Sequence, residues 1–367
     1  MTRVIQWATG VTGMMSLRHV LSRPDLELVG VRVYDPAKAG VDAGVLCGAP
    51  EAGVLTSADR DAVIATYADV VLYMGKVETD TPGCFADVCD LLASGKNVVA
   101  TGSRFIHPRS LHESLAGRIE KACHSGGSSF LGLGLYPGFI GESLAPVLSR
   151  LTERADRISV REVLNYSTYA SHDLIFNAMG FGHAPDDTTP LLTNTDYAAS
   201  AWIGSATVLA QALGLEIRSV EGFREVATTP RALTVAAGEI PAGTVGAMRF
   251  GVVADCGETM LAVEHLTRMA DDLAPDWPSE IGYQVTFEGK PNMSFHLVIG
   301  SHEEDHAEQG CLATAMHAIN AIPAVIAAEP GLYDLSTIAP FVAHWTERGV
   351  VPTTVASRRG GLSAQID

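Results

Sequence analysis

Apolar positions follow two different patterns along the chain, and the change falls near residue 140. Before it, short runs rich in β-branched residues are separated by segments with apolar residues at helical spacing. Such runs are typical of parallel strands buried on both faces, and their alternation with helices predicts right-handed β-α-β crossovers. The predicted strands cover 4–7, 26–34, 68–74, 97–101 and 129–134, and the predicted helices 14–21, 58–67, 81–94 and 110–124. Residues 1–140 therefore predict an α/β domain with a Rossmann-type, doubly wound parallel sheet.

Beyond residue 140, apolar and polar positions alternate, as in antiparallel strands with one solvated face. This pattern covers 158–166, 245–253, 259–267, 283–288 and 294–299, and one long helical stretch covers 197–213. We expect a second, α+β domain over 141–309, with an open, mostly antiparallel sheet covered on one face. That domain would carry the substrate and the subunit contact. The apolar spacing from 310 predicts a helix that returns to the first domain, and a loose tail would complete 310–367.

The first predicted strand ends in the turn ATGVTG at 8–13, directly before the first predicted helix. Strand, glycine turn and helix form the context in which a G-x-G-x-x-G pattern binds a dinucleotide. Gly10 would let the backbone approach the pyrophosphate, and Gly13 would let the helix pack close to the strand. Ala8 replaces the first glycine and fits only if its φ stays below zero. The predicted phosphate cradle is Thr9, Gly10, Val11, Thr12 and Gly13; the alternative is a tight strand-to-helix turn in another α/β protein.

Other cofactor contacts are predicted where further strands end. Asp35 lies about twenty residues past the glycine turn, where an acid accepts hydrogen bonds from the adenosine ribose; alternatively, Asp35 only starts a turn before Pro36. Arg32 and Lys38 are close enough to meet the 2′-phosphate of NADP, which Asp35 would repel, so the cofactor is NADP or NAD. Ligands of doubly wound sheets lie outside the carboxyl ends of the strands. The additional predicted contacts are Met74, Gly75, Thr101, Gly102, Pro137 and Gly138.

The charge and composition of the chain limit the classes of partner that it can bind. A net charge of −17 argues against nucleic acid and anionic membranes, although local amides can still hold phosphates. The six cysteines form no C-x-x-C pair, and neither a leader nor an apolar run of eighteen residues is recognised, which favours a cytoplasmic protein with reduced thiols. The stretch HEEDH at 302–306 matches the H-E-x-x-H zinc pattern. However, it follows Gly-Ser and is crowded with acids, as in a capped first helical turn, so no metal is expected.

Several stretches, in one order along nearly the whole chain, resemble a single family. They are VIQWATG at 4–10, GKNVV at 95–99, YPGF at 136–139, AMGFG at 178–182, EHLTR at 264–268 and AINAIPAV at 318–325. The chain resembles the NAD(P)H-dependent reductases with a dihydrodipicolinate-reductase-like N-terminal domain. The resemblance is greatest to the branch of 2,4-diaminopentanoate dehydrogenase and the native amine dehydrogenases. It implies hydride transfer to a C=N or C=O carbon, most simply reductive amination of a ketone or aldehyde, by a homodimer built through the second domain.

One departure from this family concerns its catalytic carboxylate. In the amine-forming branch an acidic residue just after the strand at 97–101 handles ammonia and its proton. Here that stretch reads TGSRF, so Ser103 and Arg104 become the catalytic candidates. Because Arg104 would repel a cationic amine, either another residue does this work or the substrate is a carbonyl compound or an anion. The remaining alternatives are a carbonyl or cyclic-imine reductase without ammonia and a non-catalytic dinucleotide-binding sensor.

The polar, aromatic-rich loop at 165–173 follows a strand and provides further candidates. Tyr169 or His172 would supply a proton to a developing alkoxide or amide, unless the loop is an ordinary solvated connector. The predicted substrate pocket consists of Tyr136, Phe139, Asn165, Tyr166 and His265. Tyr136 and Phe139 would wall the nicotinamide or, alternatively, be core aromatics at the domain crossing. His265 would otherwise be an ordinary sheet residue.

Overall fold

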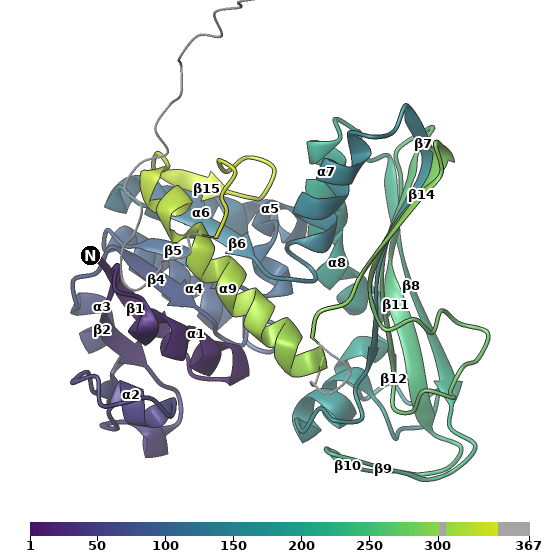
Figure 1. Cartoon of the computed structure of the whole chain (residues 1–367), viewed down its shortest axis with the longest axis horizontal. Helices are drawn as coiled ribbons and strands as arrows, with labels where there is room; N and C mark the ends of the chain where they lie inside the picture. Colours follow the sequence, from purple (N-terminus) through teal and green to yellow (C-terminus); the bar gives the residue numbers. More distant parts are fainter. Residues whose placement is uncertain (301–305, 344–367) are drawn as a thin grey trace, which may run out of the picture.

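The computed structural model describes residues 1–300 and 306–343, which form two large sheets and one two-stranded hairpin (Figure 1). Every strand pair in the first sheet is parallel. The strand order is β15-β6-β5-β4-β1-β2-β3, which reverses direction between β1 and β4, as in a doubly wound sheet. The strands are β1 Thr2–Trp7, β2 Leu26–Arg32, β3 Thr56–Ser57, β4 Val70–Tyr73, β5 Asn97–Thr101, β6 Ser129–Leu133 and β15 Gly331–Tyr333.

Helices cover both faces of this sheet, which explains why its strands are continuously apolar. Leu17 and Ile322 pack with the strands on the face of α1 and α9, whereas Phe85 and Ile119 pack on the face of α4 and α6. The helices and short turns here are α1 Val11–Ser22, η1 Pro36–Lys38, α2 Ala43–Leu46, α3 Arg60–Ala65, α4 Thr81–Ala93, η2 Ser103–Phe105, α5 Pro108–Leu111, α6 Glu113–Gly126 and α9 His306–Ala327.

One predicted helix is divided in the structure, and another begins at the predicted residue. The predicted helix at 110–124 is broken into α5 and α6 at His112, whose extended backbone (φ −168°) ends one helix and caps the next. Helix α4 begins at Thr81, but its capping side chain is Asp80, which accepts a hydrogen bond from the N–H of Gly83. Asp80 thus satisfies one of the free N–H groups at the start of the helix.

The second sheet is mixed and mostly antiparallel, in the order β14-β13-β7-β12-β11-β8, with only β7 and β12 parallel. Its inner face packs on α8, where Trp202 and Ala206 join the core. Its strands are β7 Arg154–Asn165, β8 Ser219–Thr228, β11 Val245–Asp255, β12 Met260–Arg268, β13 Gly282–Lys290 and β14 Met293–Leu297. The other elements are η3 Ile140–Leu144, α7 Ala145–Ser149, η4 Asp173–Met179, η5 Leu191–Thr193, α8 Thr195–Ala212 and the hairpin β9 Leu233–Val235 with β10 Gly238–Ile240.

The C-terminal helix returns to the first sheet as predicted. Helix α9 crosses in front of that sheet (Figure 1), and β15 then adds a parallel strand beside β6. Contrary to the expectation of no such segment, α9 is long and apolar enough by length and composition to cross a membrane. A core helix passes the same test, and Ala318, Ile319 and Ile322 are buried against the sheet. The tail from residue 344 and residues 301–305 of the HEEDH stretch lie outside the described residues, and the domain boundaries at 140 and 309 stay predictions.

Candidate functional site

The turn at 8–13 has the geometry of a phosphate cradle. At Gly10, which precedes α1, an added Cβ would meet no atom within 4 Å, and no side chain caps the first free N–H groups of α1. At Gly13 an added Cβ would lie 2.3 Å from the carbonyl oxygen of Ala8, so only glycine lets the helix approach the strand. Open space therefore lies before a helix N-terminus whose N–H groups and positive dipole end favour an anion.

The prediction that Ala8 keeps φ below zero is wrong, because its φ is +73°. The buried amide of Gln6 stabilises this conformation: its Nε2 donates to the carbonyl oxygen of Ala8 at 3.0 Å, while Ser16 Oγ donates to its Oε1 at 2.7 Å. The chain thus holds alanine in a left-handed conformation that glycine usually adopts.

We expect Ala8→Gly to increase the free energy of unfolding by up to about 1 kcal/mol, because it removes the Cβ clash of a left-handed alanine. Urea unfolding measures this change. Ala116→Gly, in the interior of α6, is the control and should cost about 1 kcal/mol. Equal destabilisation by both changes would contradict the strain at Ala8.

The three residues predicted around the adenosine meet at the end of β2. The Asp35 carboxylate accepts from the N–H of Ala37 at 2.9 Å, and Lys38 Nζ donates to the carbonyl oxygen of Thr9 at 3.0 Å. The Arg32 guanidinium lies 4.7 Å from the ring centroid of Tyr34, and its buried Nε and Nη1 have no hydrogen-bond partner among the described residues. One carboxylate and two cations therefore adjoin the cradle, so the structure leaves both NAD and NADP possible.

The predicted nicotinamide contacts lie where β4 and β5 end. Gly102 has φ +132°, and an added Cβ there would lie 2.5 Å from Val77 Cγ1, so the two loops are in close contact. The N–H of Ser103 donates to Glu78 Oε1 at 2.9 Å. Tyr197, at the start of α8, donates its hydroxyl hydrogen to the Glu78 carbonyl. The Arg104 guanidinium packs over the ring of Tyr197, with its Cζ 4.4 Å from the ring centroid. The second domain thus meets the first at this edge. Met74, Gly75 and Thr101 border the same loops.

Past β6 the chain turns sharply through Pro137 and Gly138. Gly138 has φ +129°, and an added Cβ would lie 2.0 Å from the amide nitrogen of Gly134. The Tyr136 hydroxyl oxygen lies 2.8 Å from the carbonyl oxygen of Val160 and accepts from the N–H of Glu264 at 3.0 Å. Tyr136 is therefore a core aromatic that joins β6 to the second sheet, and its hydroxyl has no free position for substrate.

Beside this turn lies a cavity of about 160 Å³, which we call the tyrosine pocket. Glu162 on β7 lines it, with one carboxylate oxygen 2.5 Å from His265 Nδ1 on the neighbouring strand β12. Burial, and then the negative charge of Glu162, raises the pKa of Tyr136, Tyr166 and Tyr283. Its lining residues are Leu135, Tyr136, Glu162, Leu164, Tyr166, Tyr169, Leu174, Tyr283, His306, Ala307, Gly310, Cys311 and Thr314.

The structure brings only some of the predicted pocket residues together. Tyr166 and Tyr169 line the tyrosine pocket, and His265 lies behind it through Glu162. Asn165 is turned away and donates to Asp271 at 2.7 Å, and His172 is exposed with its ring against Phe176. Neither Asn165 nor His172 lines the tyrosine pocket, so the roles expected for them stay predictions.

Three residues around the site were missed: Glu78, Glu162 and Tyr283. Glu162 carried a signal, because β7 places Ile158, Val160 and Leu164 on the same inward face, and an acid in such a row marks a buried charge. No pattern in the sequence marks Tyr283, because only the pairing of β13 with β7 places it opposite Glu162.

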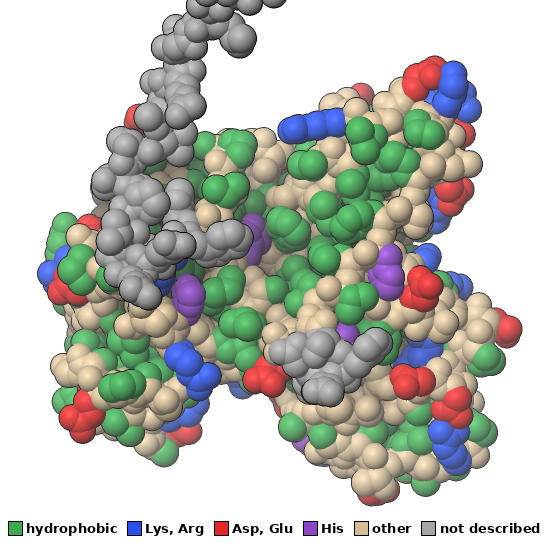
Figure 2. Space-filling view, viewed as in Figure 1, with side chains coloured by type: hydrophobic (Ala, Val, Ile, Leu, Met, Phe, Trp, Pro, Cys, Tyr) green, Lys and Arg blue, Asp and Glu red, His purple; other side chains and the backbone are tan. Residues whose placement is uncertain are grey.

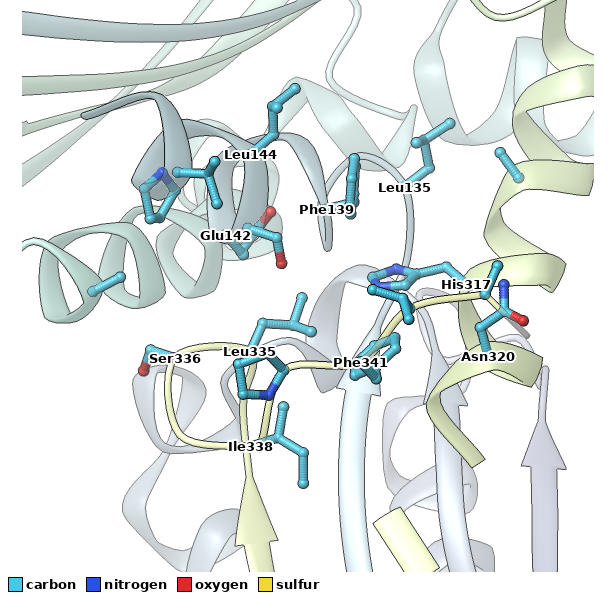
Figure 3. A pocket seen from close by; sticks show the side chains of 18 of the residues that line it. Leu135, Phe139, Glu142, Leu144, His317, Asn320, Leu335, Ser336, Ile338 and Phe341 are labelled. Carbon is cyan, nitrogen blue, oxygen red and sulfur yellow. The ribbon is translucent and has the colours of Figure 1, made fainter. Parts of the chain in front are cut away.

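A larger cavity of about 860 Å³ lies between α7, α9 and residues 335–343 (Figure 3). Apolar side chains gather on the surface between α7 and α9 (Figure 2). Phe139 lines this cavity, with its ring 5.3 Å from that of His317, and not the tyrosine pocket. Glu142 is fully buried in the cavity wall, its two carboxylate oxygens have no hydrogen-bond partner among the described residues, and burial raises the pKa of its carboxyl.

We expect Glu142→Gln to stabilise the protein at pH 7.5 by about 1 kcal/mol or more, and to have little effect near pH 4. The folded carboxyl keeps its proton at pH values where the unfolded one has lost it, so stability falls as the pH rises above the unfolded pKa. Thermal unfolding of both proteins from pH 4 to 8 measures this difference. A gap that does not change with pH would contradict the raised pKa of Glu142. Because burial lowers the pKa of His317 in both proteins, its contribution cancels.

A doubly wound sheet with an open glycine turn, joined to a mixed sheet that carries a polar pocket, defines a two-domain dinucleotide-dependent oxidoreductase. Residues 139–347 match the family model of the 2,4-diaminopentanoate dehydrogenase C-terminal domain. An amine dehydrogenase of Streptomyces virginiae is 31% identical over 347 residues, covering 91% of this chain and 95% of the relative.

The chain is also similar to two more distant proteins of the same kind. The 2,4-diaminopentanoate dehydrogenase of Acetoanaerobium sticklandii is 24% identical over 291 residues, covering 77% of each chain. The solved amine dehydrogenase of Mycobacterium smegmatis shares the fold, with a TM-score of 0.78 and 19% identity, covering 93% of this chain and 97% of that one. The chain belongs to the family of 2,4-diaminopentanoate dehydrogenase and the amine dehydrogenases, which confirms the resemblance seen in the sequence.

Proposed function

We propose that this protein is an NAD(P)H-dependent oxidoreductase of the amine dehydrogenase type. It would form an amine from ammonia and a small ketone or aldehyde by hydride transfer to a C=N carbon. One observation carries the proposal: a pocket with a buried carboxylate and tyrosine walls lies beside the turn after β6, at the sheet edge that carries the dinucleotide cradle. The names of the relatives support the same reaction type.

The residues of the cradle fit a dinucleotide. The free N–H groups at the start of α1 would hold its diphosphate, and Gly10 leaves the space that it needs. When bound, the nicotinamide supplies the hydride. The chain's own contribution is to hold the acceptor carbon close to that hydride and to exclude water. Of the two predicted proton donors, Tyr169 lines the pocket, and burial raises its pKa, so its hydroxyl remains protonated and able to donate.

Ser103 and Arg104 stay candidates at the edge of this site. Ser103 is bonded to Glu78, and Arg104 packs on Tyr197, so both would position the two loops around the nicotinamide. Neither lines the tyrosine pocket.

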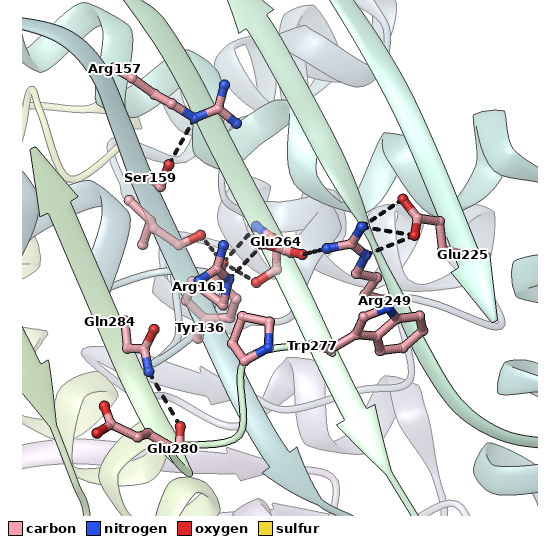
Figure 4. Close-up of polar contacts among 12 residues, drawn as sticks. Tyr136, Arg157, Ser159, Arg161, Glu225, Arg249, Glu264, Trp277, Glu280 and Gln284 are labelled. Carbon is pink, nitrogen blue, oxygen red and sulfur yellow. Dashed lines mark hydrogen bonds and ion pairs between the residues drawn. The ribbon is translucent and has the colours of Figure 1, made fainter. Parts of the chain in front are cut away.

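The remaining parts of the proposal are a cytoplasmic location and a homodimer built through the second domain. The outer face of the mixed sheet, opposite α8, carries a row of charged side chains (Figure 4). Arg161 Nε lies 2.6 Å from Glu264 Oε2, and Arg249 Nη2 lies 2.8 Å from Glu225 Oε2. A second copy would pack on this face; sedimentation velocity of the purified protein tests for the dimer.

The activity is tested by following NADH and NADPH oxidation with a series of ketones and aldehydes, with and without ammonium chloride. Oxidation that requires both carbonyl compound and ammonium is the expected result. Equal oxidation without ammonium would instead define a carbonyl reductase. A protein that binds either coenzyme but never oxidises it would be a sensor.

A further inference from the structure

We propose that Glu162 binds the amine nitrogen of the substrate in the tyrosine pocket. The proposal rests on the proposed function and deepens it, because it names the residue that replaces the carboxylate missing from Thr101–Phe105. It also defines the substrate class as a short-chain ketone or aldehyde and its primary amine.

The environment of Glu162 is that of a carboxylate prepared for a cation. The residue is only 6% exposed, and it lines the cavity from the inward face of β7. His265 Nδ1 holds one of its oxygens at 2.5 Å. A buried carboxylate is costly unless a partner compensates its charge. An ammonium or iminium in the pocket would be such a partner.

The tyrosines favour the same kind of ligand. Tyr136, Tyr166, Tyr169 and Tyr283 all line the pocket. The rings of Tyr166 and Tyr169 are stacked with their centroids 5.5 Å apart. Aromatic faces attract ammonium groups, and this attraction strengthens when water is excluded. Aromatic walls and one carboxylate together match an organic cation with a small apolar part.

The other acidic side chains near the sheet edge are less suited to this role. Glu78 is exposed, and its Oε1 accepts hydrogen bonds from both N–H and Oγ of Ser103. Glu142 lies in the separate, larger cavity. Arg104 packs on Tyr197 and does not line the tyrosine pocket, so its charge does not oppose a cation there.

The volume of the pocket limits the size of the substrate. A cavity of roughly 150 Å³ holds one benzene molecule, with about six non-hydrogen atoms. The tyrosine pocket, at about 160 Å³, would accept butanone and the amine formed from it.

Glu162 would take part in both the addition of ammonia and the loss of water. An ammonium ion gives one proton to the Glu162 carboxylate, and the ammonia that remains adds to the carbonyl carbon. The hydroxyl of the resulting carbinolamine then leaves as water with that proton, which restores the carboxylate. The iminium is then paired with the Glu162 carboxylate. A bound reduced nicotinamide would supply the hydride to the iminium carbon and become NAD(P)⁺, and a proton from solvent would complete the ammonium product.

The test compares Glu162→Gln with wild type, with butanone, ammonium chloride and the reduced coenzyme. Removal of a general acid–base group predicts a loss of about 10²- to 10⁴-fold in kcat/KM, with coenzyme affinity unchanged. Glu162→Asp should recover part of the loss. The control is Glu120→Gln, on α6 of the first domain, whose carboxylate is paired with Arg109 and lines neither cavity; this variant should retain activity.

Two results would overturn the proposal. One is a Glu162→Gln protein that retains wild-type kcat/KM; the other is a loss of activity in Glu78→Gln alone. If Glu162→Gln does not fold, calorimetry of the wild-type complex with oxidised coenzyme decides instead. We expect 2-aminobutane to bind at least tenfold more tightly than 2-butanol, and equal affinities would reject the role of Glu162. If wild type oxidises no coenzyme with any substrate, the proposed function fails, whatever the affinities.

Discussion

Replacing Gly10 by valine is expected to weaken dinucleotide binding at least 100-fold while the protein stays folded. An added Cβ at this position meets no protein atom within 4 Å, and the φ of −72° suits any residue. The valine side chain would therefore extend into the space before α1 that the diphosphate is predicted to fill. Calorimetric titration with NADH and NADPH measures the loss, and thermal unfolding should show a destabilisation below about 1 kcal/mol.

Gly13→Ala separates binding from folding at the same turn. Its new Cβ would lie 2.3 Å from the carbonyl oxygen of Ala8, so strand and helix must move apart. Overpacking of this kind typically costs about 1–3 kcal/mol, so this variant should lose stability first. If Gly10→Val binds either coenzyme as well as wild type does, the diphosphate does not lie at this turn.

The parallel sheet was predictable because each buried strand shows its burial locally, as a continuous apolar run. The elements that were missed have no such local signal. Strand β8, at the edge of the second sheet, is largely exposed along its length, and β15 is three residues long and exists only through its pairing with β6. The conformation of Ala8 could not be predicted from the local sequence either, because its positive φ depends on the buried amide of Gln6.

The cofactor contacts and the tyrosine pocket also differ in how far the sequence predicts them. The cofactor contacts follow from one turn and from strand ends, which parallel topology brings to one edge. The tyrosine pocket instead combines the turn after β6, strands β7 and β13, the segment after β7 and the start of α9. Glu162 meets His265 only because β7 and β12 pair in a particular register. Sequence patterns gave Tyr166 and Tyr169 but not the carboxylate and the tyrosine opposite them.

Asp35→Ser is expected to raise the ratio of NADP to NAD affinity by about 10- to 100-fold, whichever coenzyme wild type prefers. A hydrogen bond to a charged group contributes about 1.5–3 kcal/mol, and a ribose hydroxyl loses that bond when the carboxylate is removed. The same change removes the charge that repels a 2′-phosphate. Arg32 remains available to that phosphate, because its buried Nε and Nη1 have no hydrogen-bond partner among the described residues. Serine also caps well, so the turn at 36–38 should persist.

Asp187→Ser is the matched control for this change, because Asp187 makes the same local bond. It accepts from the N–H of Thr189 at 2.8 Å, two residues further on, as Asp35 accepts from Ala37 at 2.9 Å, but it lies in a loop of the second domain. Calorimetric affinities for both coenzymes need no turnover, so they test ribose recognition independently of the reaction. The ratio should stay constant in Asp187→Ser. An equally constant ratio in Asp35→Ser would mean that Asp35 only starts the turn before Pro36 and that the ribose is recognised elsewhere.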